Sequence, residues 1–89
     1  MINTELSIIN KLGLHARAAA KLATTAGHYA CETTLMTKGK RVDCKSVMAL
    51  MLLAAAKGTE IEIQCDGKDE EAAMAAIVAL INNRFDEDE

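Results

Sequence analysis

Large aromatic side chains are almost missing from this chain of 89 residues, which has no Trp, one Tyr and one Phe. About half of the residues are still apolar, a composition typical of a globular chain and not of a disordered one. We therefore expect a single domain spanning residues 1 to 89, with a small core that depends on the close approach of Ala, Ile, Leu, Val and Met side chains.

An excess of positive charge is missing as well. The chain has 13 acidic and 10 basic residues, a net charge of −3, which argues against general nucleic-acid binding because that needs a basic face. Residues 1 to 5 lack the charged and apolar regions of a signal peptide. No apolar run reaches the roughly 20 residues of a membrane span. We expect a cytoplasmic protein with no membrane insertion.

Cysteine pairs with metal-ligand spacing are also missing. Cys31, Cys44 and Cys65 are odd in number and widely spaced, and no CxxC pair occurs. This pattern argues against a zinc site and against a disulfide framework. We predict three buried, reduced thiols, no metal site and no cofactor.

Alternation and helical periodicity divide the chain into seven elements. Apolar alternation predicts strands over residues 2 to 9, 30 to 37, 41 to 43 and 59 to 65. Helical spacing predicts helices over residues 16 to about 26, 46 to about 56 and 69 to about 81, the last capped by Asp69. The acidic residues 86 to 89 are expected to fray. One-sided strands and amphipathic helices imply two layers, with helices on one face of a mostly antiparallel sheet. The pattern alone leaves the strand order open.

Residues 10 to 17, NKLGLHAR, join the first strand to the first helix. Gly13 allows a tight turn, so His15 falls at or just before the first helical residue. Backbone N–H groups there have no helical partner and lie at the positive end of the helix dipole. With Arg17 two residues on, the arrangement suits a phosphoryl group. The alternatives are a plain capping or surface histidine and a merely solvated arginine, and His28 is predicted to be a surface residue.

Residues 45 to 52 form a second region of interest. Ser46 is a favoured residue type for capping the second helix. That helix is apolar almost all round, more than a small sheet can bury, so some of its side chains are predicted to face solvent and dock a partner. The predicted docking residues are Lys45, Val47, Met48, Met51 and Leu52. The alternative is that all the apolar ones belong to the core.

Two segments, Gly13-Leu14-His15-Ala16-Arg17 and Lys45-Ser46-Val47-Met48, resemble the signatures of the HPr family, the histidine-containing phosphocarriers of the bacterial phosphoenolpyruvate-dependent phosphotransferase system. The likeness extends over essentially the whole chain. It implies an α+β open-faced sandwich, in which three helices cover one face of a four-stranded antiparallel sheet of order 1-4-2-3.

The resemblance also implies a function. His15 would accept a phosphoryl group on Nδ1 from Enzyme I and pass it to an EIIA domain. The backbone N–H groups of Ala16, Arg17 and Ala18 would cradle that group, with the Arg17 guanidinium neutralising its oxygens. Ser46 would be the target of an HPr kinase/phosphorylase. Such a protein is a stoichiometric carrier and not an enzyme, and we expect a monomer.

One position departs from the family pattern, which has Pro directly after the arginine where this chain has Ala18. Alanine adds one N–H donor and favours the helix, so we expect the site to survive the exchange. The run 18 to 20 of three alanines fits the nitrogen-type, NPr-like branch better than the sugar-type form. Two other functions stay open: a regulatory binding protein controlled through Ser46 without a carrier role, and a metal-binding ferredoxin-like domain, which the cysteine spacing disfavours.

Overall fold

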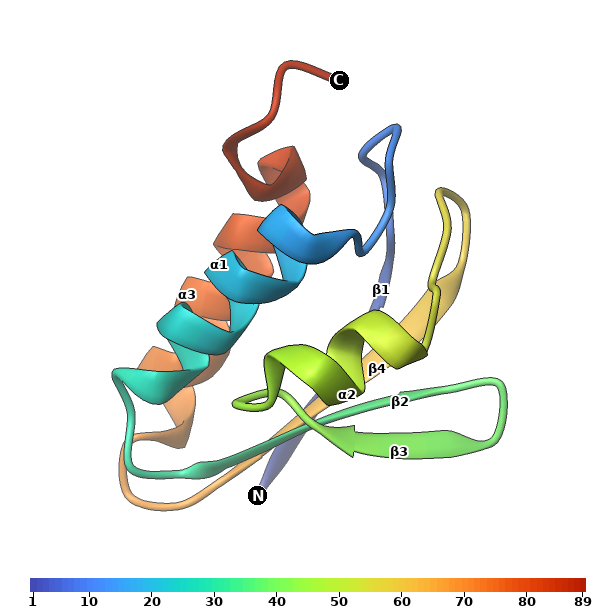
Figure 1. Cartoon of the computed structure of the whole chain (residues 1–89). Coiled ribbons are helices and arrows are strands. Elements are labelled where there is room, and N and C mark those ends of the chain that lie inside the picture. Colours follow the sequence, from blue (N-terminus) through green and yellow to red (C-terminus); the bar gives the residue numbers. More distant parts are fainter.

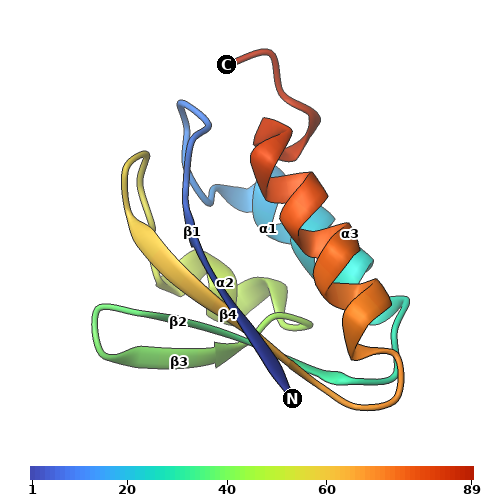
Figure 2. The ribbon, with the colours of Figure 1, turned by 180° about the vertical axis from the view of Figure 1, so that it is seen from behind.

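The computed structural model describes residues 1–89, and its four strands form one antiparallel sheet of order β1-β4-β2-β3. Three helices lie on one face of this sheet, which confirms the predicted open-faced sandwich (Figures 1 and 2). None of the helices combines the length and apolar character needed to cross a membrane. Along the chain the elements are β1 (Ile2–Ser7), α1 (Ala16–Gly27), β2 (Glu32–Thr37), β3 (Lys40–Asp43), α2 (Val47–Leu52), β4 (Glu60–Asp66), α3 (Glu70–Asn82) and the 3-10 turn η1 (Arg84–Asp86).

Alternation along the strands gives the sheet one buried face, as predicted. Leu35 of β2 faces Ile63 of β4 across the sheet, and both side chains are fully buried. The β2–β3 hairpin turns at Lys38 and Gly39, whose positive φ angles match the two-residue turn that favours a tight hairpin. Residues on the opposite face remain exposed or half-buried.

Helices α1 and α3 lie side by side and antiparallel over the sheet (Figures 1 and 2). The buried positions of α1 are mostly alanines, so the helix approaches its neighbours closely without large side chains. The fully buried Phe85, just after α3, supplies the one large ring of the core. All three cysteines are buried and unpaired, and burial raises the pKa of the Cys44 thiol to about 12.

The second helix is shorter than the sequence predicted. We expected it to continue to about residue 56, but α2 ends at Leu52, and Ala54 takes a left-handed backbone conformation with φ 51°. The chain leaves the helix there so that the Ala55 carbonyl can accept a hydrogen bond from the Leu14 N–H at 2.8 Å. This long-range bond joins the end of α2 to the turn before α1. The spacing of apolar residues in the sequence does not predict it.

The role predicted for Asp69 is also wrong. Asp69 occupies the position before α3, but its carboxylate caps no helical N–H. It instead accepts hydrogen bonds from the N–H groups of Ala30 at 2.7 Å and Cys31 at 2.9 Å, in the loop before β2. These bonds lower the pKa of Asp69 below its ordinary value of 3.8, the bond from Ala30 contributing most.

The acidic tail differs from the frayed segment that we expected. Residues 84 to 86 have positive φ angles and turn the chain back toward the start of α1 (Figure 1). Lys21 Nζ donates to the Phe85 carbonyl at 2.9 Å, and the Lys11 N–H donates to the Glu89 carbonyl at 3.0 Å. These contacts hold the tail beside residues 10 to 17.

Candidate functional site: the start of helix α1

The turn before α1 is fixed by a compact set of hydrogen bonds. Gly13 has φ +67° and its N–H donates to the Asn10 carbonyl at 3.2 Å. Asn10 is fully buried, and its side-chain Nδ2 donates to the Gly13 carbonyl at 2.8 Å. Together with the bond from Leu14 to Ala55, these contacts set the point at which α1 begins.

His15 is the N-cap residue of α1. Its backbone is extended, with φ −77° and ψ 179°, and its carbonyl accepts the first helical bond from the Ala19 N–H at 2.8 Å. The N–H groups of residues 16 to 18 precede that bond and have no helical partner. The His15 side chain does not cap them, and no acidic residue lies in the first turn. The helix start therefore offers three free donors to an anion.

The His15 ring has one polar contact. Its Nε2 forms a hydrogen bond with the Glu87 Oε2 of the returning tail, and 28% of the side chain is exposed. The other carboxylate oxygen, Oε1, accepts from Asn10 Nδ2 at 2.9 Å. The bond from Asn10 lowers the pKa of Glu87 below its ordinary value of 4.5, and the neighbouring His15 and Arg17 lower it further. Glu87 is thus ionised at neutral pH.

An open hollow of about 750 Å³ lies over the helix start, lined by Lys11, His15, Arg17 and the tail residues 86 to 89, among others. The two lysines beside it are paired with the tail: Lys11 Nζ lies 3.4 Å from Glu89, and Lys21 Nζ lies 3.7 Å from Asp86. Arg17 is exposed and makes no ion pair or side-chain hydrogen bond. Its guanidinium is therefore the cation left available to an incoming anion.

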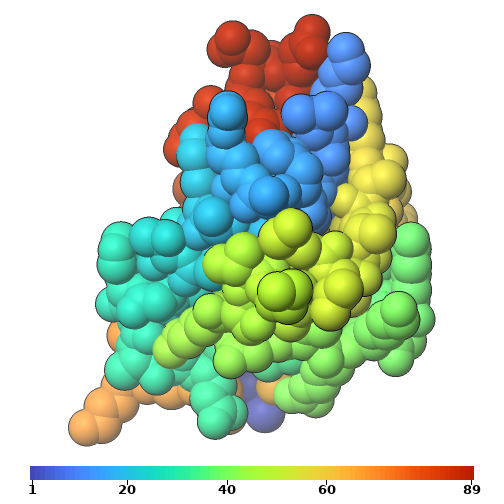
Figure 3. All heavy atoms as spheres, in the orientation of Figure 1, coloured from blue at the N-terminus to red at the C-terminus, as the bar shows by residue number.

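An apolar patch lies beside the helix start. Its side chains expose between 38% and 73% of their surface. The patch consists of Leu12, Val47, Met48, Met51 and Leu52. Figure 3 shows residues 11 to 17, α2 and the tail meeting on one face of the molecule. A shallow hollow that includes Leu12, His15 and Met51 joins the patch to the histidine.

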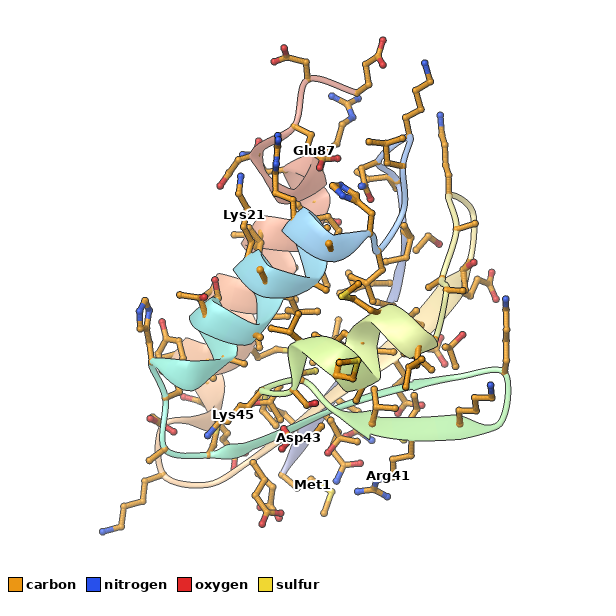
Figure 4. All side chains as sticks on the ribbon, in the orientation of Figure 1. Met1, Lys21, Arg41, Asp43, Lys45 and Glu87 are labelled. Atoms are coloured by element: carbon orange, nitrogen blue, oxygen red, sulfur yellow. The ribbon has the colours of Figure 1, made fainter.

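Lys45 and Ser46 lie at the other end of α2 from the segment that contacts Gly13. The Ser46 hydroxyl caps α2 by accepting from the Ala49 N–H at 3.2 Å. Lys45 is exposed, and its Nζ donates to the Tyr29 carbonyl at 2.9 Å, at the end of α1 (Figure 4). The predicted residues therefore form two groups, with His15, Arg17 and the free amides at one end and Ser46 with Lys45 at the other.

Three residues at the site escaped the sequence analysis: Asn10, Leu12 and Glu87. Leu12 could have been found, because an apolar residue between Lys11 and Gly13 in a turn has little chance of burial. Asn10 and Glu87 carry no comparable signal. Their partners lie far away in the chain, and the acidic composition of the tail is typical of a solvated end.

The comparisons with known proteins place this open-faced sandwich, whose first helix begins at His15, in the class of small phosphocarrier domains. The family model described as "PTS HPr component phosphorylation site" matches residues 2–83. The chain belongs to the HPr family, the phosphocarriers of the phosphotransferase system.

Individual relatives agree with this assignment. The chain is 53% identical over 88 residues to the phosphocarrier protein HPr of Xylella fastidiosa, covering 99% of each chain. It is 42% identical to the phosphocarrier protein NPr of Escherichia coli, covering 98% of each chain. The crystal structure of HPr-C-His from Thermoanaerobacter tengcongensis superposes with a TM-score of 0.96 at 36% identity, covering all of both chains. Identity to this HPr thus exceeds identity to this NPr, and the nitrogen-type branch stays a prediction.

Proposed function

We propose that this chain accepts a phosphoryl group on Nδ1 of His15 from Enzyme I and passes it to a histidine of an EIIA domain. The observation that carries this proposal is the position of His15 at the start of α1, immediately before three N–H groups without helical partners. Neutral imidazole is nucleophilic near neutral pH, and phosphoryl transfer needs positioning and charge stabilisation more than covalent help.

Each part of the site has a defined task in this proposal. A ring nitrogen of His15 attacks phosphorus while the bond to the donor breaks. The N–H groups of Ala16, Arg17 and Ala18 donate to the phosphoryl oxygens at the positive end of the helix. The unpaired Arg17 guanidinium moves onto the same oxygens. Because the group must leave again, the chain acts as a stoichiometric carrier and turns nothing over alone.

The apolar patch is the proposed docking surface for both partners. Exposed methionines adapt to surfaces of different shape, which suits a carrier that meets a donor and then an acceptor. The patch adjoins the helix start, so a partner seated on it would lie over His15. Exchange between partners requires transient complexes with small interfaces.

The direct test is incubation with phosphoenolpyruvate and catalytic amounts of Enzyme I, followed by addition of EIIA. We expect one acid-labile, base-stable phosphoryl group per chain, transferred onward when EIIA is added. The chain has two histidines, so His28→Ala is the matched control for His15→Ala. His28 is exposed and lies at the far end of α1, so its loss should leave acceptance unchanged. A His15→Ala chain that is still phosphorylated would refute the proposal.

Ser46 is the proposed regulatory site. A phosphate there adds about −1.5 to −2 charges beside Val47 and Met48. That charge would repel the acidic surfaces of partners and slow acceptance at His15. The hydroxyl already occupies a helix start, so its modification need not unfold α2.

The remaining expectations belong to the same proposal: a monomer that works in the cytoplasm. A regulatory binding protein without a carrier role is the competing function, controlled through Ser46 alone. The phosphorylation test separates the two, because a purely regulatory protein gains no phosphoryl group on His15 from Enzyme I.

A further inference from the structure

The Glu87 carboxylate lies between the imidazole of His15 and a buried amide. Its Oε2 is hydrogen-bonded to His15 Nε2, and its Oε1 accepts from Asn10 Nδ2 at 2.9 Å. Asn10 is fully buried, and its Nδ2 also donates to the Gly13 carbonyl. The two acceptors, the Gly13 carbonyl and the Glu87 carboxylate, together fix the orientation of the Asn10 amide. Only 12% of the Glu87 side chain is exposed. Figure 4 shows Glu87 on the returning tail, above the first turn of α1.

The tail holds Glu87 in place from both directions. Before it, Phe85 is fully buried and its carbonyl accepts from Lys21 Nζ at 2.9 Å. After it, the Glu89 carbonyl accepts from the Lys11 N–H at 3.0 Å. A carboxylate anchored in this way can orient a ring, which a freely moving tail residue cannot do.

The charge of Glu87 determines where the proton of His15 lies. An ionised carboxylate has no proton and can only accept hydrogen bonds. A neutral imidazole has one N–H, so the bond to Glu87 requires that proton on Nε2. The other nitrogen, Nδ1, then carries the lone pair, and it makes no hydrogen bond in the structure.

We propose that Glu87 is a positioning residue for phosphoryl transfer, which keeps the proton of His15 on Nε2 and leaves Nδ1 as the nucleophile. This inference rests on the carrier function proposed above. During acceptance, the Nδ1 lone pair forms the N–P bond as the bond between phosphorus and the donor breaks. The electron pair of the broken bond leaves with the donor. The ring gains a positive charge, which the Glu87 carboxylate balances while the proton stays on Nε2. Delivery reverses the step, with no additional proton donor.

The test compares Glu87→Gln with Glu71→Gln, the same change at an exposed glutamate in the first turn of α3, outside the hollow over His15. The amide introduced by Glu87→Gln has one acceptor oxygen where the carboxylate has two, so it must turn its NH₂ toward either Asn10 or His15. We expect the Nε2–H tautomer to lose its preference, as measured from the ¹⁵N shifts of the neutral His15 ring. We also expect the rate of phosphorylation at saturating Enzyme I to fall roughly tenfold in Glu87→Gln. The concentration of Enzyme I that gives half of the maximal rate should stay within about twofold of the wild-type value. Glu71→Gln should match the wild type in all three quantities.

The outcomes distinguish this inference from the function on which it rests. A wild-type chain that accepts no phosphoryl group refutes the carrier function, whatever Glu87 does. An active wild type with an unchanged tautomer or an unchanged rate in Glu87→Gln refutes the role of Glu87 alone. A faster rate in that variant also refutes it, because the tail would then be an obstacle to the site. Retained amide spectra exclude unfolding as the cause of a slower rate.

Discussion

Gly13 lies directly against the Ala55 carbonyl: a Cβ added at Gly13 would be 2.4 Å from the Ala55 oxygen. The same oxygen accepts the hydrogen bond from the Leu14 N–H, so it cannot move away without breaking that bond. This contact joins the end of α2 to the turn before His15. It makes the position of the proposed site depend on a backbone approach that only glycine permits.

Gly13→Ala should therefore destabilise the fold. The left-handed φ costs about 1–2 kcal/mol for a residue with a Cβ, and the clash adds to it, so we expect a total loss of about 2–4 kcal/mol. Urea denaturation measures the free energy of unfolding. Gly39→Ala is the control, since Gly39 has φ +76° but nothing within 4 Å of the added Cβ. Equal losses in the two variants would show that the Ala55 contact contributes nothing.

Met48→Asp should weaken the docking of Enzyme I without unfolding the chain. Met48 exposes 67% of its surface, so we expect the free energy of unfolding to change by no more than about 0.5 kcal/mol. The half-saturating concentration of Enzyme I should rise roughly tenfold. Thr24→Asp adds the same charge at an exposed position of α1 outside the apolar patch and should leave that concentration unchanged. A large stability loss in Met48→Asp would support a core role for this methionine.

Ser46→Asp should slow acceptance at His15 by roughly tenfold, because the added charge opposes an acidic partner surface. Asn caps helices as well as Asp but carries no charge, so Ser46→Asn is the matched control. The difference between the two variants should shrink at about 1 M salt, where the screening length falls to about 3 Å. Acceptance at the wild-type rate by Ser46→Asp at low salt would contradict the proposed regulation.

Asp69 should make stability depend on pH in the acidic range. Its pKa in the folded chain lies below the ordinary value of 3.8, chiefly because it accepts from Ala30. The contribution is therefore complete above about pH 5 and is lost as the pH falls through the folded pKa. Asp69→Asn should narrow the difference in the free energy of unfolding between about pH 7 and about pH 3. Asp88→Asn, at a carboxylate without a hydrogen bond in the structure, should leave that difference unchanged.

Local signals in the sequence were sufficient for most of the elements. Alternation located the buried face of each strand, Gly13 marked the turn, and Ser46 marked the start of α2. The strand order came from the family resemblance, because alternation says nothing about which strands pair. Two of the errors have a common physical cause, a long-range hydrogen bond that outweighs the local preference. The Ala55 carbonyl accepts from Leu14 in the turn before α1, and the Asp69 carboxylate accepts from Ala30 in the loop before β2.

The site shows the same division. The position of His15 before free amides follows from a glycine turn and a helix start, both of which are local features. The contact of its ring with Glu87 does not follow from any local feature, because Glu87 lies 72 residues away along the chain. Phe85 is fully buried, and this burial returns the tail to α1, so that Glu87 comes to lie beside His15.

We infer that a ring nitrogen of His15 holds the phosphoryl group at the start of α1. The most direct measurement is an NMR spectrum of the ¹⁵N-labelled chain after phosphorylation by phosphoenolpyruvate and Enzyme I. We predict a ³¹P–¹⁵N coupling to Nδ1 of His15, together with large shifts of the amide signals of residues 16 to 18. A coupling to a nitrogen of His28, or phosphorus attached to no imidazole nitrogen, would show that His15 is not the phosphoryl acceptor.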